Sequence, residues 1–189
     1  MDIGYSTKAI PSDSKFIYLL GADDINPSEI PKDSFVVYQG HHGDVGASVA
    51  NVILPGAAYT EKSGTYINTE GRAQLTRAAV PPPNGAREDW KIIRALSEVA
   101  GKPLDYDDIS QLQQRMGRIS PTLLSLTTLD KTSPSIAELG LGQFQKYSGA
   151  PSDAPLELAI KDFYLTNSIS RASSTMAKCS KVSFGFTAY

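Results

Sequence analysis

Three short apolar runs near the start of the chain constrain its fold most. Residues 16–20, 35–38 and 52–54 are apolar throughout, and a glycine or proline follows each run within two residues. Uninterrupted runs of this kind are typical of strands in a parallel sheet, because helices cover both faces of such a sheet. The sequence therefore predicts an α/β domain of three layers with a mostly parallel sheet, whose strands are buried on both faces.

A helix is predicted after the triple proline at 81–83. Asn84 or Gly85 is expected to cap its start, and Gly101 is expected to end it. Apolar residues recur along one face of this helix, and Trp90 is expected to anchor that face against the sheet. The members of the face are Trp90, Ile93, Leu96, Val99 and Ala100.

Two further helices follow from the same apolar spacing. One is predicted from about Asp107 to the residue before Ser120, and its apolar residues are Ile109, Leu112, Met116 and Ile119. The other is predicted near the C-terminus, with Thr166 or Asn167 as its cap. The face expected to be buried on this last helix contains Ile169, Ala172, Met176 and Cys179.

The chain divides into three predicted segments. Residues 1–119 are expected to form the α/β domain. Residues 120–155 are expected to form an irregular arm, because 17 of these 36 residues are Ser, Thr, Pro or Gly. Residues 156–189 are expected to complete the domain with the C-terminal helix and a strand at 156–160, where apolar and polar residues alternate.

The charge balance argues against several classes of partner. The 20 acidic and 18 basic residues give a formal net charge of −2, so charge offers no reason to expect binding to nucleic acid. Residues 1–70 carry four lysines and nine acidic residues, whereas residues 71–189 carry fourteen basic and eleven acidic ones. This asymmetry suits a chain docked between differently charged neighbours. The longest apolar run, residues 16–20, is far too short to span a bilayer.

The adjacent pair His41 and His42 is the first candidate for a metal site or a general base. Adjacent residues on an extended chain point in opposite directions, so the pair would need ligands from elsewhere. The sequence offers no further histidine and a single cysteine, Cys179. A histidine pair at a strand end, hydrogen-bonded to backbone, is the favoured interpretation, and no metal site is assigned.

The glycine-rich segment 40–46 is the second candidate, because it follows a predicted strand and precedes a short helix. Its spacing matches neither common phosphate-binding signature, which favours a tight turn that depends on glycine. Asp23 and Asp24 follow another predicted strand and are candidate ligands for a ribose hydroxyl. A helix cap is the simpler interpretation of the two carboxylates.

No known catalytic signature appears in the sequence. G-x-S-x-G, H-E-x-x-H and C-x-x-C are all absent from the sequence. Residues 12–15 match S-x-x-K, but a pattern this short is expected by chance. Cys179 is interpreted as a small core residue, and one cysteine cannot hold an iron–sulfur cluster. No catalytic, cofactor-binding or metal-binding residue is therefore assigned to this chain.

Several long blocks resemble the large iron–sulfur subunit of respiratory complex I. They span residues 35–47, 50–74, 86–101 and 160–179 and together cover 74 of the 189 residues. A shorter motif begins with Leu54-Pro55 and is shared with molybdopterin enzymes broadly. Its other members are Glu61, Gly64, Thr65, Asn68, Glu70, Gly71 and Arg72. Gly64 and Gly71 are expected in turns, and Asn68, Glu70 and Arg72 are expected to bond loop backbone.

The resemblance implies the C-terminal portion of that subunit, in its molybdopterin-oxidoreductase-like region. It implies a noncatalytic structural role in the peripheral NADH-oxidising arm of complex I, on the matrix side of the mitochondrial inner membrane and without a membrane span. Iron–sulfur clusters are expected in a partner chain that carries the N-terminal portion, with other peripheral-arm subunits as further partners. The chain is expected to be a fragment, or one half of a subunit encoded in two pieces.

An alternative function from another class stays open at this point. The chain could belong to a molybdopterin oxidoreductase in which Asp23, Asp24 and the turn at 40–46 contact the nucleotide of the pterin cofactor. Elemental analysis for molybdenum or tungsten discriminates between the two functions.

Overall fold

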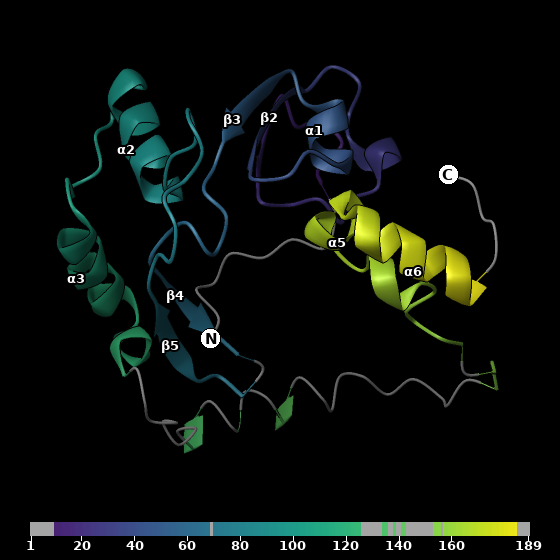
Figure 1. Ribbon diagram of the computed structural model, residues 1–189. Helices are drawn as coiled ribbons and strands as arrows, with labels where there is room; N and C mark the ends of the chain where they lie inside the picture. Colours follow the sequence, from purple (N-terminus) through teal and green to yellow (C-terminus); the bar gives the residue numbers. More distant parts are fainter. Residues whose placement is uncertain are drawn as a thin grey trace.

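The computed structural model describes residues 10–68, 70–125, 134–135, 138, 141–142, 153–155 and 157–184. Figure 1 shows the arrangement of the helices and strands. The predicted arm at 120–155 lies mostly outside the described residues. Its described part includes the short 3-10 helix η2, Pro121–Leu124.

The predicted parallel sheet is confirmed. Strands β1 (Phe16–Leu20), β2 (Phe35–Gly40) and β3 (Val52–Pro55) pair in that order, and both pairings are parallel. The observed strands extend the predicted runs by two residues in β2 and by one in β3. The 3-10 helix η1 (Pro27–Glu29) lies in the connection from β1 to β2, and helix α1 (Val45–Val49) lies in the connection from β2 to β3.

The core lies on one face of this sheet. It contains Ile17 and Leu19 from β1 and Val36 and Tyr38 from β2, each at most 9% exposed. Alternate residues of a strand point to the same face, which explains why each strand contributes residues two apart. Residues from α1 and from the strand connections complete the cluster; they are Ile10, Ala22, Ile25, Ile30, Ala47, Val49 and Ala50.

The opposite face of the sheet is open over β1. Phe16 is 61% exposed, Leu20 is 51% exposed and Phe35 is 48% exposed. The expectation of strands buried on both faces is therefore wrong here. Helix α2 (Asp89–Val99) stands beside β3 on this side as a partial third layer, and it does not reach across to β1.

Helix α2 begins later than the sequence predicts. Gly85 adopts a positive φ of +92°, and the chain then pairs with the end of β3. The Arg87 amide donates to the Pro55 carbonyl at 3.1 Å, and the Ala57 amide donates to the Arg87 carbonyl at 2.8 Å. These bonds keep the backbone extended, so neither Asn84 nor Gly85 caps the helix. The predicted stop is confirmed, because Gly101 has a φ of +70° just beyond the helix.

Helix α3 spans Ile109–Ile119, close to the predicted bounds. Its cap is Asp108, whose carboxylate accepts a hydrogen bond from the Gln111 amide at 2.8 Å. A two-stranded antiparallel sheet of β4 (Gly64–Ile67) and β5 (Ala73–Thr76) lies between the parallel sheet and η2 in Figure 1.

The C-terminal part differs from the prediction in two respects. Residues 157–160 form no strand, because none of the described strands pairs with them. The single predicted helix is divided at Ser173, whose backbone is extended, into α5 (Ser168–Ala172) and α6 (Ser174–Phe184). The 3-10 helix η3 (Phe163–Leu165) precedes α5. Asn167 is confirmed as a cap, since its side chain accepts from the Ser170 amide at 2.9 Å.

Within the described part of the chain, no helix is both long enough and apolar enough to cross a membrane.

Trp90 does not anchor α2 against the parallel sheet. Its ring is half-buried and meets Tyr106 edge-on at a centroid distance of 6.4 Å, and its indole N–H donates to the Glu88 carboxylate at 2.8 Å. The ring lines a cleft of about 280 Å³ between α2, α3 and β4. Ile93 and Leu96 face the parallel sheet instead.

Replacing Trp90 with Ala should therefore lower the free energy of unfolding by about 2 kcal/mol, less than the 3–5 kcal/mol typical of a fully buried tryptophan. Thermal denaturation of the chain in its native assembly measures this change. Val99→Ala is the matched control on the same helix, because Val99 is 88% exposed and should cost about 0.5 kcal/mol or less. A loss of 4 kcal/mol or more at Trp90 would restore the core-anchor interpretation.

Candidate functional site

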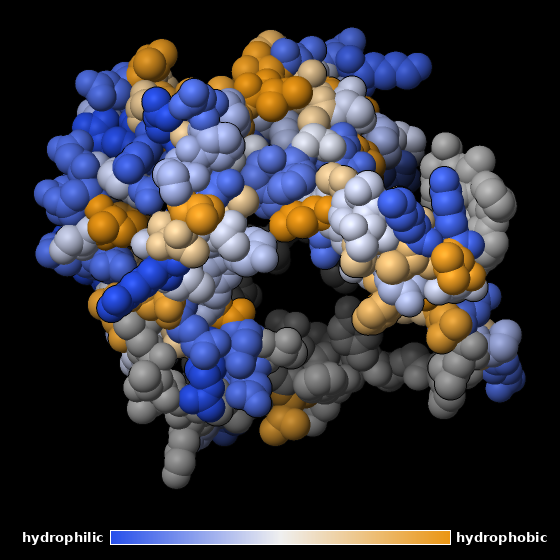
Figure 2. Space-filling model, in the orientation of Figure 1, coloured by the Kyte–Doolittle hydropathy of each residue, from blue (hydrophilic) through white to orange (hydrophobic). Residues whose placement is uncertain are grey.

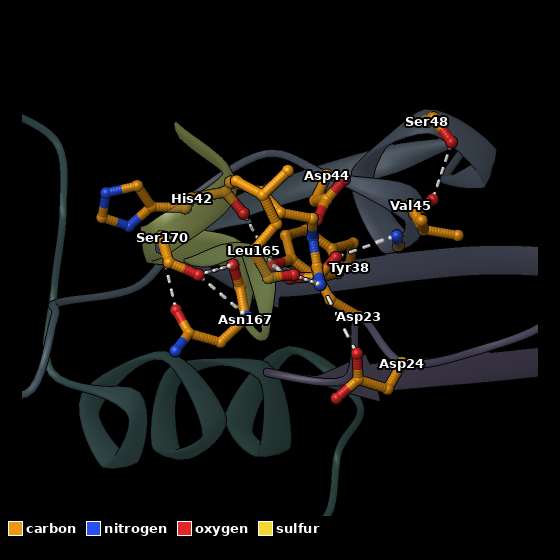
Figure 3. A network of polar contacts seen from close by, with 12 residues as sticks. Asp23, Asp24, Tyr38, His42, Asp44, Val45, Ser48, Leu165, Asn167 and Ser170 are labelled. Carbon is orange, nitrogen blue, oxygen red and sulfur yellow. Dashed lines mark hydrogen bonds and ion pairs between the residues drawn. The ribbon is translucent and has the colours of Figure 1, made fainter. Parts of the chain in front are cut away.

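The carboxyl ends of β1 and β2 meet at one edge of the sheet, where open α/β sheets bind their ligands. The turn after β1 carries Asp23 and Asp24, and the turn after β2 carries His42 and Asp44. Figure 3 shows the three carboxylates and the His42 backbone carbonyl in a polar network with Tyr38 and with residues of the C-terminal segment. The structure therefore brings together the candidates that the sequence singled out.

Asp23 is a buried carboxylate with two partners inside the chain. It is 9% exposed, accepts from the Tyr38 hydroxyl at 2.6 Å, and accepts from the Gly46 amide at 2.9 Å. Gly46 lies in the first turn of α1, so Asp23 caps that helix from a distant part of the chain. Burial and the Asp23 carboxylate raise the pKa of Tyr38, which keeps this hydroxyl a donor. The cap interpretation of Asp23 is confirmed.

The glycine-rich turn at 40–46 makes room for the Tyr38 ring. A Cβ atom at Gly46 would lie 2.7 Å from the ring and 2.8 Å from the Ala22 carbonyl oxygen. A Cβ atom at Gly40 would also collide with the ring. The Tyr38 hydroxyl reaches the turn itself, 2.9 Å from the His42 carbonyl oxygen. The interpretation as a turn that depends on glycine is therefore confirmed by close packing.

Arg171 of helix α5 connects the C-terminal segment to both strand-end turns. Its guanidinium donates to the Asp44 carboxylate and lies 3.6 Å from the Asp24 carboxylate. The Leu165 carbonyl accepts a further bond at 3.4 Å. The hydrogen bond to Asp44 raises the pKa of Arg171 despite partial burial, so the guanidinium remains charged. Asp24 is therefore half of an ion pair, and it does not act as a cap.

His41 and His42 bond to each other, contrary to the expectation that they point apart. Their Nδ1 atoms are 2.7 Å apart and their rings meet edge-on at an interplanar angle of 81°. The chain bends directly after Gly40, where β2 ends, so the alternation of an extended strand no longer applies. Desolvation, followed by repulsion from His42 and from Lys62, lowers the pKa of His41. One ring nitrogen of each histidine is thereby occupied.

The structure also shows a buried polar residue that sequence reasoning missed. Gln39 in β2 has 0% exposure, and it accepts from the Tyr18 hydroxyl and donates to the Asp89 carboxylate at 2.8 Å. Asp89 begins α2 and pairs with Lys62. The only sequence signal for this link is a glutamine directly after an apolar run. Burial, followed by the charge of Asp89, raises the pKa of Tyr18.

The motif at 61–72 builds the hairpin of β4 and β5. The Glu61 carboxylate accepts from the Ala58 amide at 2.9 Å, and the Asn68 side chain accepts from the Arg72 amide at 2.9 Å. Gly71 has a φ of +84°, as expected for a glycine in a turn. The expectation of a turn at Gly64 is wrong, since this glycine lies within β4, where a Cβ atom would be 3.3 Å from the Tyr66 ring. The expected bond to loop backbone is confirmed for Asn68, whereas the Glu70 and Arg72 side chains form an ion pair at 3.8 Å.

Among the described residues, no group of three or more His, Cys, Asp or Glu side chains could hold a metal ion. Cys179 is half-buried in α6 and forms no disulfide.

Two models of known protein families match the chain. The family model for molybdopterin oxidoreductase matches residues 2–99, which is more than half of the chain. The chain belongs to the molybdopterin oxidoreductase family. A second family model, for the C-terminal region of one NADH-ubiquinone oxidoreductase subunit, matches residues 128–179 and so extends over most of the predicted arm.

Curated relatives share high sequence identity with this chain over nearly the whole length of the chain. The mitochondrial 78 kDa subunit of NADH-ubiquinone oxidoreductase from Candida albicans is 56% identical over 95% of the chain and 25% of the relative. The mitochondrial NADH dehydrogenase iron-sulfur protein 1 of Solanum tuberosum is 49% identical over 95% of the chain and 24% of the relative. The 75 kDa subunit of Reclinomonas americana is 48% identical over 94% of the chain and 25% of the relative.

The resemblance to the large subunit is therefore confirmed. The chain spans about a quarter of the length of the curated relatives it matches.

The residues at the strand ends do not fit the pterin cofactor that the family name implies. Asp23 is engaged by Tyr38 and Gly46, while Arg171 pairs with both Asp24 and Asp44. A nucleotide would have to displace these internal partners from the carboxylates. A cleft of about 790 Å³ lies beside Arg171, but its walls are formed mainly by the C-terminal segment from 159 to 166. The alternative function is therefore not favoured by the geometry.

Replacing Asp23 with Ala should lower the free energy of unfolding by about 3 kcal/mol, because the Tyr38 hydroxyl and the Gly46 amide both lose a charged acceptor. Thermal denaturation in the native assembly measures the loss. Asp24→Ala is the matched control and should cost about 0.5 kcal/mol or less, since the Asp24 side chain is 87% exposed. Equal losses at the two positions would contradict the assignment of Asp23 as the buried cap.

The pair Arg171 and Asp44 should show a coupling free energy of about 1 kcal/mol in a double-mutant cycle with Arg171→Met and Asp44→Asn. The reason is that both side chains are less than one-third exposed, at 30% and 24%. The comparison pair is Arg94 and Asp107, 2.9 Å apart but with Asp107 77% exposed. Its coupling should be about half as large. Absence of coupling between Arg171 and Asp44 would mean that the C-terminal segment is held in some other way.

Proposed function

We propose that this chain is a noncatalytic structural part of the large iron–sulfur subunit of respiratory complex I, in the peripheral NADH-oxidising arm. In this proposal it lies on the matrix side of the mitochondrial inner membrane. Partner chains carry the electrons from NADH to ubiquinone. The names of the relatives support the assignment to NADH-ubiquinone oxidoreductase, and two of the three relatives described above are named as mitochondrial.

The observation that carries the noncatalytic role is the closure of the strand-end site. Each carboxylate that could hold a ribose or a metal there already has a partner within the chain. The two histidines of the adjacent turn bond to each other. Because these carboxylates hold the turns and the C-terminal segment, the arrangement stabilises the fold, which supports a structural role.

The proposed partners are the chain that carries the N-terminal iron–sulfur portion and the neighbouring subunits of the peripheral arm. In this proposal the cluster-bearing portion is either a separate polypeptide or the rest of the same polypeptide. The clusters belong to that partner in the proposal, because a single cysteine provides too few thiolates for any cluster.

Purification from mitochondria through a tag on this chain tests the proposal. The cluster-bearing portion and NADH dehydrogenase activity should copurify with the tagged chain. After separation from its partners, the chain should be colourless and hold less than stoichiometric iron, zinc, molybdenum and tungsten. Stoichiometric molybdenum or tungsten would favour the cofactor-contacting alternative, and a tagged chain that brings down no complex I subunit would reject the assignment.

Expression of the chain alone provides a second test. The open sheet face and edge strands should make the isolated chain insoluble or molten, because apolar groups meet water or other copies. Coexpression with the cluster-bearing portion should restore solubility. A cooperative thermal transition and a monomeric profile for the isolated chain would instead indicate a free-standing domain.

A further inference from the structure

An apolar groove lies between the open face of the parallel sheet and helix α2. Its volume is about 650 Å³, and all three strands and the helix line it. Phe16, Leu20, Phe35 and Val52 form the floor, while Ile93 and Leu96 of α2 form one wall. Figure 2 shows hydrophobic residues gathered on the surface between α1 and α2.

The floor of the groove is unusually exposed for part of a parallel sheet. Phe16 and Phe35 stack with a ring separation of 6.4 Å and an interplanar angle of 11°, yet they are 61% and 48% exposed. Leu20 is 51% exposed at the other end of β1. Parallel sheets are covered on both faces, so this surface needs a further layer.

The polar side chains that line the groove are already satisfied by the chain. The Tyr18 hydroxyl donates to Gln39. The Ser97 hydroxyl donates to the Arg94 carbonyl at 2.6 Å and accepts from the Leu104 amide at 3.1 Å. An occupant would find no polar side chain here in need of a partner, so the groove fits apolar side chains and does not fit a polar ligand or an ion.

We infer that the groove receives the apolar face of a helix from the part of the large subunit that lies outside this chain. The inference rests on the proposed function. The chain covers only 22–25% of its curated relatives, so about three-quarters of such a subunit is available to supply the helix. A helix about 10 Å wide covers roughly two strands spaced by about 4.8 Å. With α2 beside β3, one more helix fits over β1 and β2.

Site-specific photocrosslinking in the assembled complex tests the inference. A benzoylphenylalanine probe replaces Leu20 in the groove, and the same probe at Val99 serves as the control. Val99 is 88% exposed on α2 and does not line the groove. The probe at position 20 should crosslink to a segment of the cluster-bearing portion with apolar residues at helical spacing, at least tenfold more than the control does. Crosslinks only to this chain, to a second copy, to another subunit or to lipid would overturn the inference.

A charge substitution supplies an independent readout. Leu20→Lys should reduce copurification of the cluster-bearing portion at least tenfold, whereas Val99→Lys should leave it unchanged. Equal effects of the two variants would also overturn the inference. The two proposals fail differently: a wild-type chain absent from complex I rejects the proposed function, whereas a chain that assembles normally with Leu20→Lys rejects only the groove assignment.

Discussion

The arrangement of the strand ends depends on the Tyr38 side chain. Its ring belongs to the core of the sheet, at 2% exposure, and its hydroxyl donates to the buried carboxylate of Asp23. Through that carboxylate, the turn after β1 holds the first turn of α1. Gly40 and Gly46 are needed because any side chain there would meet the tyrosine ring. One aromatic residue thus joins core packing, a helix cap and two loop conformations.

This construction uses the edge of the sheet where other α/β proteins bind ligands. Arg171 neutralises the remaining carboxylates, Asp24 and Asp44, and ties α5 to the two turns. Carboxylates that already accept hydrogen bonds from the chain itself leave few acceptors for a substrate. In the motif at 61–72, the Asn68 side chain closes the hairpin of β4 and β5, and the Glu61 carboxylate bonds backbone in the connection before β4. Membership of the molybdopterin oxidoreductase family is therefore compatible with a structural role.

The two faces of the parallel sheet differ in how completely the chain covers them. α1 and the strand connections bury one face, whereas α2 covers only the part of the other face beside β3. Gln39 and Asp89 hold α2 in this position through a buried hydrogen bond. The proposed structural role and the apolar groove are linked, since a structural domain inside a larger subunit needs a surface that other segments complete.

Much of the fold could be predicted from local sequence, because its signals act over a few residues. The apolar runs identified β1, β2 and β3, the spacing of apolar residues identified α2 and α3, and Asn167 was recognised as a cap. The errors occurred where the outcome depended on the presence or absence of a distant backbone partner. Pairing of Arg87 with Pro55 delayed the start of α2, and the alternation at 157–160 found no neighbouring strand among those described.

The chemistry of the candidate site could be predicted only in part. By itself, the sequence determined that one cysteine and two histidines provide few metal ligands, and that Asp23, Asp24 and the glycine-rich turn follow strands. It could not determine which carboxylate is buried, since Asp23 and Asp24 are chemically identical neighbours. Tertiary structure decided this by placing Tyr38 and Gly46 against Asp23. It placed Arg171, which is 147 positions along the chain from Asp24, against the Asp24 carboxylate. The physical reason is that burial and ion pairing depend on contacts between residues far apart in the chain, which no local pattern records.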